Sequence, residues 1–356
     1  MITENYSNKV DGLINKFKNY TKAPNDKIKV EKLKFGSNLY NFRENIIYED
    51  YNCIYKNCLL NQALASIEER EIELLDNVQF ELFQDLKPNS KIFCTFHYAS
   101  YRLILAILLK NNIDVSLVVG NEPYTNQRTQ YFEQFEIIKK KYKINPKFSI
   151  INAEDSMGFK QMIETLKNGT NLLFYLDGNS GLNEKASNLL KINFLDHQIF
   201  SRKGVPFLSY LTKSDIVPIV MKRFDDLKTH KIEIGKTIPF LKEKKDCSFS
   251  TVLSEIYSLL EKQILLKPDY WECWLYLDKY YMQHKLYKDA RINDFYNKYN
   301  KSRFEEIELR SNFYLFDRLK SVFHPIHQEF YNSFKEGKLD FDKKQNDIMI
   351  NHNIIY

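Results

Sequence analysis

The sequence predicts an α/β fold in which helices cover a mostly parallel sheet. From about residue 90 onward, short apolar runs rich in β-branched and aromatic residues recur, as expected of strands that are buried on both faces. Segments with apolar residues at helical spacing separate these runs, and such alternation is typical of a parallel sheet. The 356-residue chain is long enough for such a domain with further segments at its ends.

The flanking segments complete a division into three parts. Residues 1–88 are polar, and from Asn61 to Leu75 apolar residues recur at helical spacing with acidic residues opposite them. From Tyr281 to Glu336 the chain is aromatic and charged, and we expect helices there. We therefore expect a helical amino-terminal segment (1–88), an α/β core (89–282) and a helical carboxy-terminal extension with a polar tail (283–356).

The core supplies the individual strands and helices. The expected strands are Ile92–Phe96, Val115–Val119, Phe148–Ile151, Leu172–Leu176 and Ile216–Met221. The expected helices are Tyr101–Lys110, Arg128–Tyr142, Ser156–Leu166 with Asp155 as its N-cap, Gly204–Thr212, and 249–266, which Lys267-Pro268 ends. Because His97 and Asp177 each follow a strand directly, we expect both at the carboxyl edge of the sheet, where open α/β sheets bind ligands.

The charge of the chain is mildly basic, with a formal net charge of +6. Lysine and arginine are dense in residues 1–34 and 279–303, which indicates solvated helix faces or, as the alternative, docking onto anionic lipid or an acidic carrier protein. No nucleic-acid-binding signature accompanies this charge, so we expect no nucleic-acid partner. Lys, Asn, Ile and Tyr are abundant in every segment, which we attribute to AT-rich codons.

Cysteine usage and the amino terminus favour a cytoplasmic protein. No pair among the five cysteines has Cys-x-x-Cys spacing, so neither a disulfide framework nor a zinc site is expected. The histidines also lack metal-ligand spacing, and we predict no metal site and no tightly bound cofactor. The first residues lack the apolar core of a signal peptide. The longest apolar run, Leu103 to Leu109, is far shorter than the ~20 residues of a membrane span. A peripheral position at the inner face of the membrane stays open.

Three blocks of sequence carry a family resemblance. They are Phe96-His-Tyr-Ala-Ser-Tyr-Arg102, then Leu172 to Gly181 with Ile192 to Arg223, and finally Leu266-Lys-Pro-Asp-Tyr-Trp-Glu-Cys-Trp274. In order and spacing they resemble the late acyltransferases of bacterial lipid A biosynthesis, the lauroyl and myristoyl transferase group of the lysophospholipid acyltransferase superfamily. The resemblance covers about residues 90 to 281, and Gly204 to Arg223 and Pro268 to Trp274 carry it best.

The resemblance implies an activity and a base. These enzymes carry a His-x4-Asp/Glu motif at the end of a strand, and His97 matches its histidine. The implied reaction moves an acyl group from an acyl carrier protein or coenzyme A thioester, the co-substrate, to a hydroxyl or amine. His97 would remove the proton from the acceptor, which contributes roughly 10²–10⁴-fold to the rate. A carboxylate would fix its tautomer.

The acidic position of the motif holds Arg102, which departs from the family. Arginine accepts no hydrogen bond and opposes a positive charge on His97. Three alternatives follow. Another carboxylate, Asp177 or Glu122, replaces the missing acid; His97 acts alone, or Arg102 binds a phosphate or carboxylate of a changed substrate; or the protein is a catalytically silent relative that binds a lipid or a protein partner.

Four further residues are candidates for substrate binding. Gly178 opens a glycine-rich turn that indicates close approach to a ligand, with an ordinary β-turn as the alternative. Arg202 and Lys203 precede a helix start and suit the phosphates of a carrier-protein or coenzyme A donor, unless they form a solvated basic pair. Arg223 ends a strand and would pair with an anionic substrate group or with a structural acid.

The acceptor is the least defined part of this hypothesis. The family usually carries an amino-terminal membrane anchor, which this chain lacks, and the chain has roughly 75 additional residues at its end. Both departures favour a soluble or peripheral acceptor, namely a lipid, a peptide or a specialised metabolite.

Overall fold

The computed structural model describes residues 4–18, 25–42, 51–78, 90–178, 188–195, 197–277, 300–301, 303–337, 349 and 354. The chain forms two compact units. Unit 1 consists of Met1–Tyr20 and Lys56–Cys273, and unit 2 consists of Thr21–Tyr55 and Trp274–Tyr356. Each unit is made of two separate stretches of the chain.

Unit 1 contains a six-stranded sheet of order β3-β2-β4-β1-β7-β8. The strands are β1 (Lys91–Thr95), β2 (Val115–Val119), β3 (Phe148–Asn152), β4 (Asn171–Tyr175), β7 (Asp215–Arg223) and β8 (His230–Ile234). All neighbours pair in parallel except β7 and β8, which are antiparallel. The predicted α/β class with a mostly parallel sheet is confirmed, and β1 and β4 are its two middle strands.

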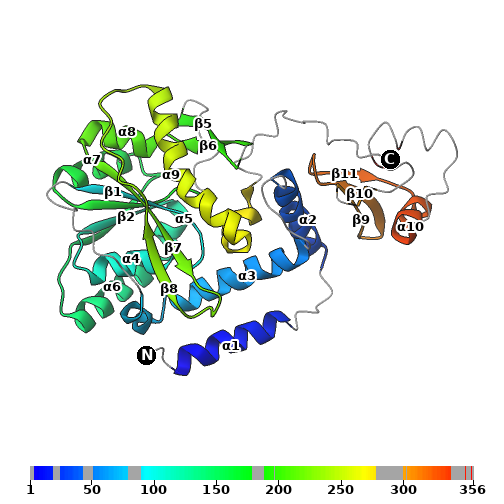
Figure 1. Cartoon of the computed structure of the whole chain (residues 1–356), viewed down its shortest axis with the longest axis horizontal. Helices are drawn as coiled ribbons and strands as arrows, with labels where there is room; N and C mark the ends of the chain where they lie inside the picture. The colour runs from blue at the N-terminus through cyan, green and yellow to red at the C-terminus, as the bar shows by residue number, and fades with distance from the viewer. Residues whose placement is uncertain are drawn as a thin grey trace. The chain divides into compact units, whose positions relative to one another are not determined.

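Helices cover both faces of this sheet (Figure 1). One face carries α4 (Leu103–Lys110), α6 (Arg128–Tyr142) and the 3₁₀ helix η1 (Ile72–Asp76), which bury apolar side chains in one cluster with the strands. The other face carries α7 (Gly158–Lys167), α8 (Gly204–Thr212) and α9 (Asp246–Leu266). Residues 103–109 are all buried because α4 lies between the sheet and other helices. The sheet therefore has the doubly covered core that its apolar strands predict.

The remaining elements of unit 1 are short. Helix α5 (Asn121–Asn126) precedes α6, and a hairpin of β5 (Leu189–Phe194) and β6 (His197–Arg202) packs against α9. The 3₁₀ helices η3 (Pro268–Tyr270) and η4 (Glu272–Leu275) follow α9. Asp155 is not the N-cap of α7, because the cap is Met157, whose backbone N–H donates to Asp155 Oδ1 at 2.7 Å.

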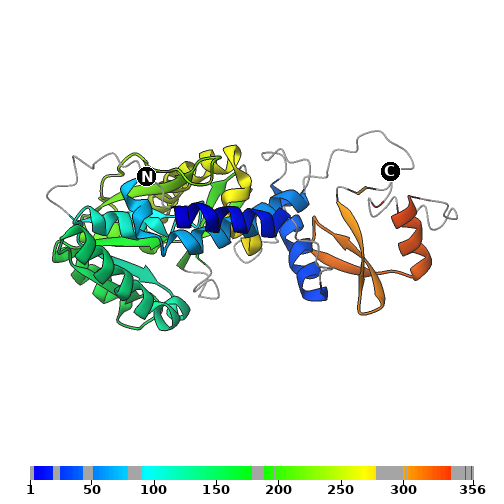
Figure 2. The ribbon, with the colours of Figure 1, turned by 90° about the horizontal axis from the view of Figure 1, so that it is seen from below.

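Two amino-terminal helices lie along each other, as Figures 1 and 2 show. Helix α1 (Glu4–Lys18) packs on α3 (Tyr51–Glu68) through Tyr6 and Val10, which are buried with Leu64 and with Leu74 of η1. This part of the helical prediction for residues 1–88 agrees with the structure. Helices α1 and α3 thus precede β1, the first strand of the sheet, in the chain.

Unit 2 contains an antiparallel sheet of order β11-β10-β9, made of β9 (Phe304–Leu309), β10 (Asn312–Asp317) and β11 (Val322–Pro325). Helix α10 (Gln328–Glu336) lies against the sheet (Figure 2). Phe334 of α10 packs with Leu315 on one face, and Leu33 of α2 (Asp26–Asn41) packs with Phe316 on the other. The prediction of a helical extension is therefore wrong for residues 304–325. Side chains of this stretch alternate between two faces with period two, as strands require. No helix among the described residues has the length and apolarity to cross a membrane.

Candidate functional site

His97 lies just beyond the carboxyl end of β1, in a tight turn that leads into α4. Tyr98 N–H donates to Phe96 O at 2.8 Å, and Ala99 adopts a positive φ of 50°. Positive φ is uncommon for residues other than glycine, and such residues cluster at functional sites. Ala99 N–H donates to Tyr270 O at 2.9 Å, which helps to hold this conformation. The turn therefore keeps the imidazole at the edge of the sheet.

Asp177 is the carboxylate partner of His97. Strands β1 and β4 are neighbours with Thr95 opposite Tyr175, so the residues two positions further on meet at the same edge. Asp177 Oδ1 lies 2.8 Å from His97 Nδ1, and both carboxylate oxygens accept the His97 backbone N–H at 3.0 Å. Of the two carboxylates considered as a replacement for the missing acid, Asp177 is the one that hydrogen-bonds to His97.

The carboxylate is buried, whereas the imidazole is partly open. Asp177 is 2% exposed and also accepts the indole N–H of Trp271 at Oδ2, at 2.8 Å. Because a carboxylate only accepts hydrogen bonds, Nδ1 of a neutral His97 carries the proton and Nε2 carries a lone pair. The His97 side chain is 21% exposed, and no hydrogen bond within the described ranges reaches Nε2. Such an Nε2 is available as a base.

Two tyrosines flank the imidazole. The ring of Tyr101 stands edge-on to His97 at 4.7 Å between centroids, and the ring of Tyr175 lies at 5.1 Å. Tyr101 donates to Glu272 Oε2 at 3.0 Å, and Tyr175 donates to Tyr101 O at 3.2 Å. Burial raises the pKa of both phenols, so both stay protonated near neutral pH. The tyrosines therefore restrict rotation of the ring without competing for its proton.

The electrostatic surroundings raise the pKa of His97 above its usual value. Burial acts in the opposite direction and lowers this pKa. The Asp177 charge and hydrogen bond and the more distant Glu272 outweigh burial, and Arg102 opposes them. The arrangement thus makes His97 a stronger base than a free imidazole.

Arg102 and Glu122, candidates for substrate binding, lie in ordinary structural settings. Arg102 Nη1 donates to Glu69 Oε2 at 3.0 Å, and its guanidinium lies over the Tyr101 ring. Glu122 is exposed in the first turn of α5 and makes no contact with His97. Arg102 therefore lies beside the site as a paired charge, and Glu122 is not the partner of His97.

Gly178 lies against the edge of the imidazole ring. A Cβ built there would lie 3.8 Å from His97 Cε1 and 3.7 Å from Tyr175 O, which are ordinary contact distances. The position does not require glycine for its own backbone. A longer side chain would, however, crowd the ring edge that carries Nε2. The rest of the predicted turn, 179–181, lies outside the described residues.

Arg202 and Lys203 differ in how their charges are balanced. Lys203 Nζ lies 3.6 Å from Asp246 Oδ1 at the surface. Arg202 has two buried guanidinium nitrogens, Nε and Nη2, that lack a hydrogen-bond partner. The other arginines of the described chain that are not exposed each pair with a carboxylate, namely Arg102, Arg223, Arg303 and Arg318. Unpaired buried donors are costly, so Arg202 is a candidate anion ligand.

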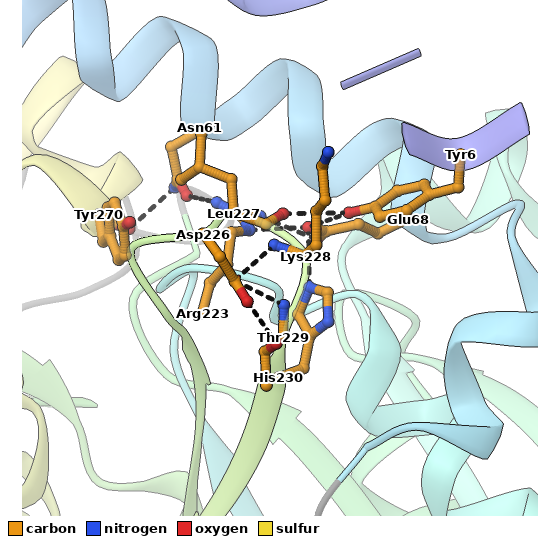
Figure 3. Close-up of polar contacts among 10 residues, drawn as sticks. All are labelled: Tyr6, Asn61, Glu68, Arg223, Asp226, Leu227, Lys228, Thr229, His230 and Tyr270. Carbon is orange, nitrogen blue, oxygen red and sulfur yellow. Dashed lines mark hydrogen bonds and ion pairs between the residues drawn. The ribbon is translucent and has the colours of Figure 1, made fainter. Parts of the chain in front are cut away.

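Arg223 belongs to a buried network and is not open to a substrate (Figure 3). Its Nε and Nη2 donate to the two oxygens of Glu68 at 2.7 and 2.8 Å, and Nη1 donates to Asn61. His230 Nε2 lies 3.0 Å from Glu68 Oε1, and Tyr6 donates to the same oxygen at 3.3 Å. The side chains of Arg223 and Glu68 are fully buried. Of the two interpretations of Arg223, the structural acid is the one observed.

Trp271 and Glu272 are the site residues that sequence reasoning missed. In the sequence, the tryptophans and tyrosines from Trp271 to Tyr281 are typical of core packing or of a wall for an acyl chain. Trp271 is indeed buried, at 1% exposure, but its N–H also contacts the carboxylate of the site. A buried indole needs a hydrogen-bond acceptor, and this requirement was the available signal.

Comparisons with known proteins give no identity for the chain. No protein-family model matches the sequence, and no curated protein matches it. Within the described ranges, no group of three or more His, Cys, Asp or Glu side chains is placed to hold a metal ion.

Proposed function

We propose that the protein is an acyltransferase with His97 as general base and Asp177 as its orienting carboxylate. The single observation that carries this proposal is the 2.8 Å hydrogen bond between His97 Nδ1 and Asp177 at the carboxyl edge of the parallel sheet. The bond leaves Nε2 free to take a proton and stabilises the imidazolium that forms. The resemblance to lipid A late acyltransferases supplies the reaction class.

The proposed reaction transfers an acyl group from a thioester to a hydroxyl or amine. Nε2 of His97 takes the acceptor proton while the acceptor oxygen or nitrogen attacks the thioester carbonyl. The tetrahedral intermediate then collapses, the carbon–sulfur bond breaks, and the thiolate leaves and receives the proton from the imidazolium. Asp177 keeps the ring oriented in both steps.

The donor is the thioester of acyl carrier protein or coenzyme A, and Arg202 supports this choice. Both donors carry a phosphate next to the pantetheine arm, and a guanidinium with two unpaired donors suits such a group. Burial raises the pKa of Tyr257, and the charges of Asp177 and Arg202 act on this pKa in opposite directions. Tyr257 also donates to Leu176 O at 3.3 Å, next to Asp177. The acceptor is a soluble or peripheral lipid, peptide or metabolite.

Acceptor-dependent thiol release tests this function. The full chain is incubated with acyl carrier protein or coenzyme A thioesters and candidate acceptors, and free thiol is measured over time. His97→Ala should reduce release roughly 10²–10⁴-fold. His327→Ala, which removes an exposed histidine of unit 2, should leave it unchanged.

Two other outcomes would contradict the proposal. Release that His97→Ala does not reduce would remove His97 from catalysis. No release with any donor, together with binding of a lipid or protein partner, would favour the alternative of a catalytically silent relative.

A further inference from the structure

The segment that follows α9 runs beside the turn that holds His97. Trp271 forms an isolated antiparallel bridge with Tyr98. Glu272 N–H donates to His97 O at 2.9 Å, and Tyr270 O accepts the Ala99 N–H at the same distance. Backbone hydrogen bonds on both sides of Trp271 therefore tie this segment to the catalytic turn.

The side chain of Trp271 fixes the second oxygen of the Asp177 carboxylate. His97 Nδ1 donates to Asp177 Oδ1 at 2.8 Å, and the indole N–H of Trp271 donates to Asp177 Oδ2 at 2.8 Å. The indole is 1% exposed and packs against Phe194 at 5.3 Å between centroids. A carboxylate held at both oxygens cannot turn away from the imidazole without losing a hydrogen bond.

The side chain of Glu272 acts on the other partner of the pair. Its Oε2 accepts the hydroxyl of Tyr101, whose ring stands edge-on to His97. Its Oε1 accepts Gln62 Nε2 at 3.0 Å. Glu272 thereby holds the tyrosine that limits rotation of the imidazole.

Side chains on one face of α3 form hydrogen bonds to the backbone of this segment. Asn61 Nδ2 donates to Tyr270 O at 3.0 Å, and Cys58 Sγ lies 3.5 Å from Trp271 O. Cys58, Asn61 and Gln62 are three and four residues apart, so they lie on one side of the helix. Helix α3 therefore helps to hold the segment that contacts His97 and Asp177.

We propose that Trp271 and Glu272 are positioning residues for the His97–Asp177 pair. Trp271 sets the orientation of the carboxylate, and Glu272 sets that of the imidazole through the His97 backbone and Tyr101. This inference rests on the proposed function for its catalytic meaning, whereas the orientation itself exists without turnover. The groups that act on His97 in this arrangement are Asp177, Glu272, Tyr101, Tyr175 and Arg102.

The test measures the tautomer of His97 by ¹⁵N NMR of the full chain with labelled histidine. In the native protein the neutral ring should be mostly the Nδ1–H form. Trp271→Phe should shift the ring toward a mixture with the Nε2–H form and lower kcat roughly 10–100-fold, as loss of orienting partners does elsewhere, with the donor KM unchanged. Trp274→Phe is the matched control, because it removes another buried indole that makes no bond to Asp177.

A second pair of variants tests the glutamate and covers a folding failure of Trp271→Phe. Glu272→Ala should loosen Tyr101 and shift the tautomer, and Glu272→Gln should restore it, since the amide oxygen still accepts the tyrosine hydroxyl. Equal tautomer ratios in Trp271→Phe and Trp274→Phe, or in Glu272→Ala and Glu272→Gln, would overturn the inference. Failure of the proposed function would show instead as no turnover by the native protein, and the NMR comparison would still decide.

Discussion

The pairs His97–Asp177 and His230–Glu68 of unit 1 differ in what else contacts the carboxylate. In the first pair, His97 Nδ1 lies 2.8 Å from Asp177 Oδ1 and the imidazole side chain is 21% exposed. In the second, His230 and Glu68 are 3.0 Å apart and the imidazole is 2% exposed (Figure 3). Distance and residue type alone therefore do not separate the two pairs.

The difference teaches which pair can do chemistry. Glu68 is already balanced by a bidentate arginine, Arg223, and further satisfied by Tyr6. Among the described residues, the hydrogen bonds to Asp177 come from the backbone and ring of His97 and from the indole N–H of Trp271. An imidazolium at His97 would therefore pair with the Asp177 carboxylate, whereas the Glu68 carboxylate beside His230 is already paired with Arg223.

The largest expected effect is on catalysis and comes from Asp177→Asn. The asparagine amide would donate to Nδ1 and force the proton onto Nε2, so His97 would lose its free lone pair. We expect kcat to fall by roughly 10³–10⁴-fold, as measured by thiol release at saturating donor. Asp155→Asn, in an exposed turn before α7, should leave kcat unchanged. A loss of less than about tenfold for Asp177→Asn would contradict the orienting role.

The next effect is on stability and comes from the second pair. Glu68→Gln removes the charge that balances fully buried Arg223, which should cost about 3–5 kcal/mol of unfolding free energy in urea titrations. Glu164→Gln breaks the exposed pair with Lys160 and should cost about 1 kcal/mol or less. Equal losses for the two variants would show that burial does not distinguish these carboxylates.

A smaller effect is expected on the donor. Arg202→Gln should weaken binding of acyl-phosphopantetheine roughly tenfold or more, because a hydrogen bond to a charged group contributes about 1.5–3 kcal/mol. It should leave binding of acyl-pantetheine, which lacks the phosphate, unchanged. Lys213→Gln, at the other end of α8, is the matched surface control. Equal weakening of both ligands by Arg202→Gln would rule out a phosphate contact.

The smallest expected effect is a shift in the pH profile of kcat/KM. His97 must be neutral to act as a base, so activity should rise with pH through its pKa, which lies above the usual value near 6.5. Glu272→Gln removes one of the charges that raise this pKa and should move the midpoint to lower pH. A midpoint that stays in place would exclude Glu272 as an electrostatic contributor.

The two pairs should also respond to pH in opposite ways as contributors to stability. The pKa of folded His97 is raised, so its contribution is full below the pKa of the unfolded chain and is lost as pH rises through the folded value. Burial would raise the pKa of Glu68, but Arg223 and His230 lower it by more. Its contribution is therefore present above the unfolded pKa near 4.3 and is lost as pH falls. The free energies of unfolding of Glu68→Gln and His97→Ala, measured by urea titration at several pH values, would give the two contributions separately.

Sequence reasoning recovered the five parallel strands of the sheet and the edge on which His97 and Asp177 lie, but it missed the antiparallel strand β8. The strands were visible because each is a short apolar run, and His97 and Asp177 follow two of them directly. The strand order was not visible, because the pairing of β1 with β4 joins residues 80 positions apart. From the sequence, Asp177 and Glu122 were both candidate carboxylate partners of His97. The structure shows that Asp177 forms the hydrogen bond.

The supports of the site and the sheet of unit 2 escaped for other reasons. The contact of Trp271 with Asp177 depends on a crossing of distant segments, which no local periodicity encodes. Residues 304–325 belong to a stretch that we expected to be helical, whereas Leu315 and Phe316 pack on opposite faces of the sheet, as successive residues of a strand do. The two residues of the turn from β9 to β10, Arg310 and Ser311, both have positive φ, which glycine or asparagine usually signals.

The carboxylate of the site lies just beyond the end of β4, whereas the His-x4-Asp/Glu motif would place it on the helix that follows the histidine. Strands β1 and β4 are the two middle strands of the sheet, and central strands open last in native-state hydrogen exchange. Partial opening of α4 or of the sheet edges would thus leave His97 and Asp177 together. The hydrogen bond of the site should persist until global unfolding, and its lifetime should follow the slowest-exchanging amides of the molecule.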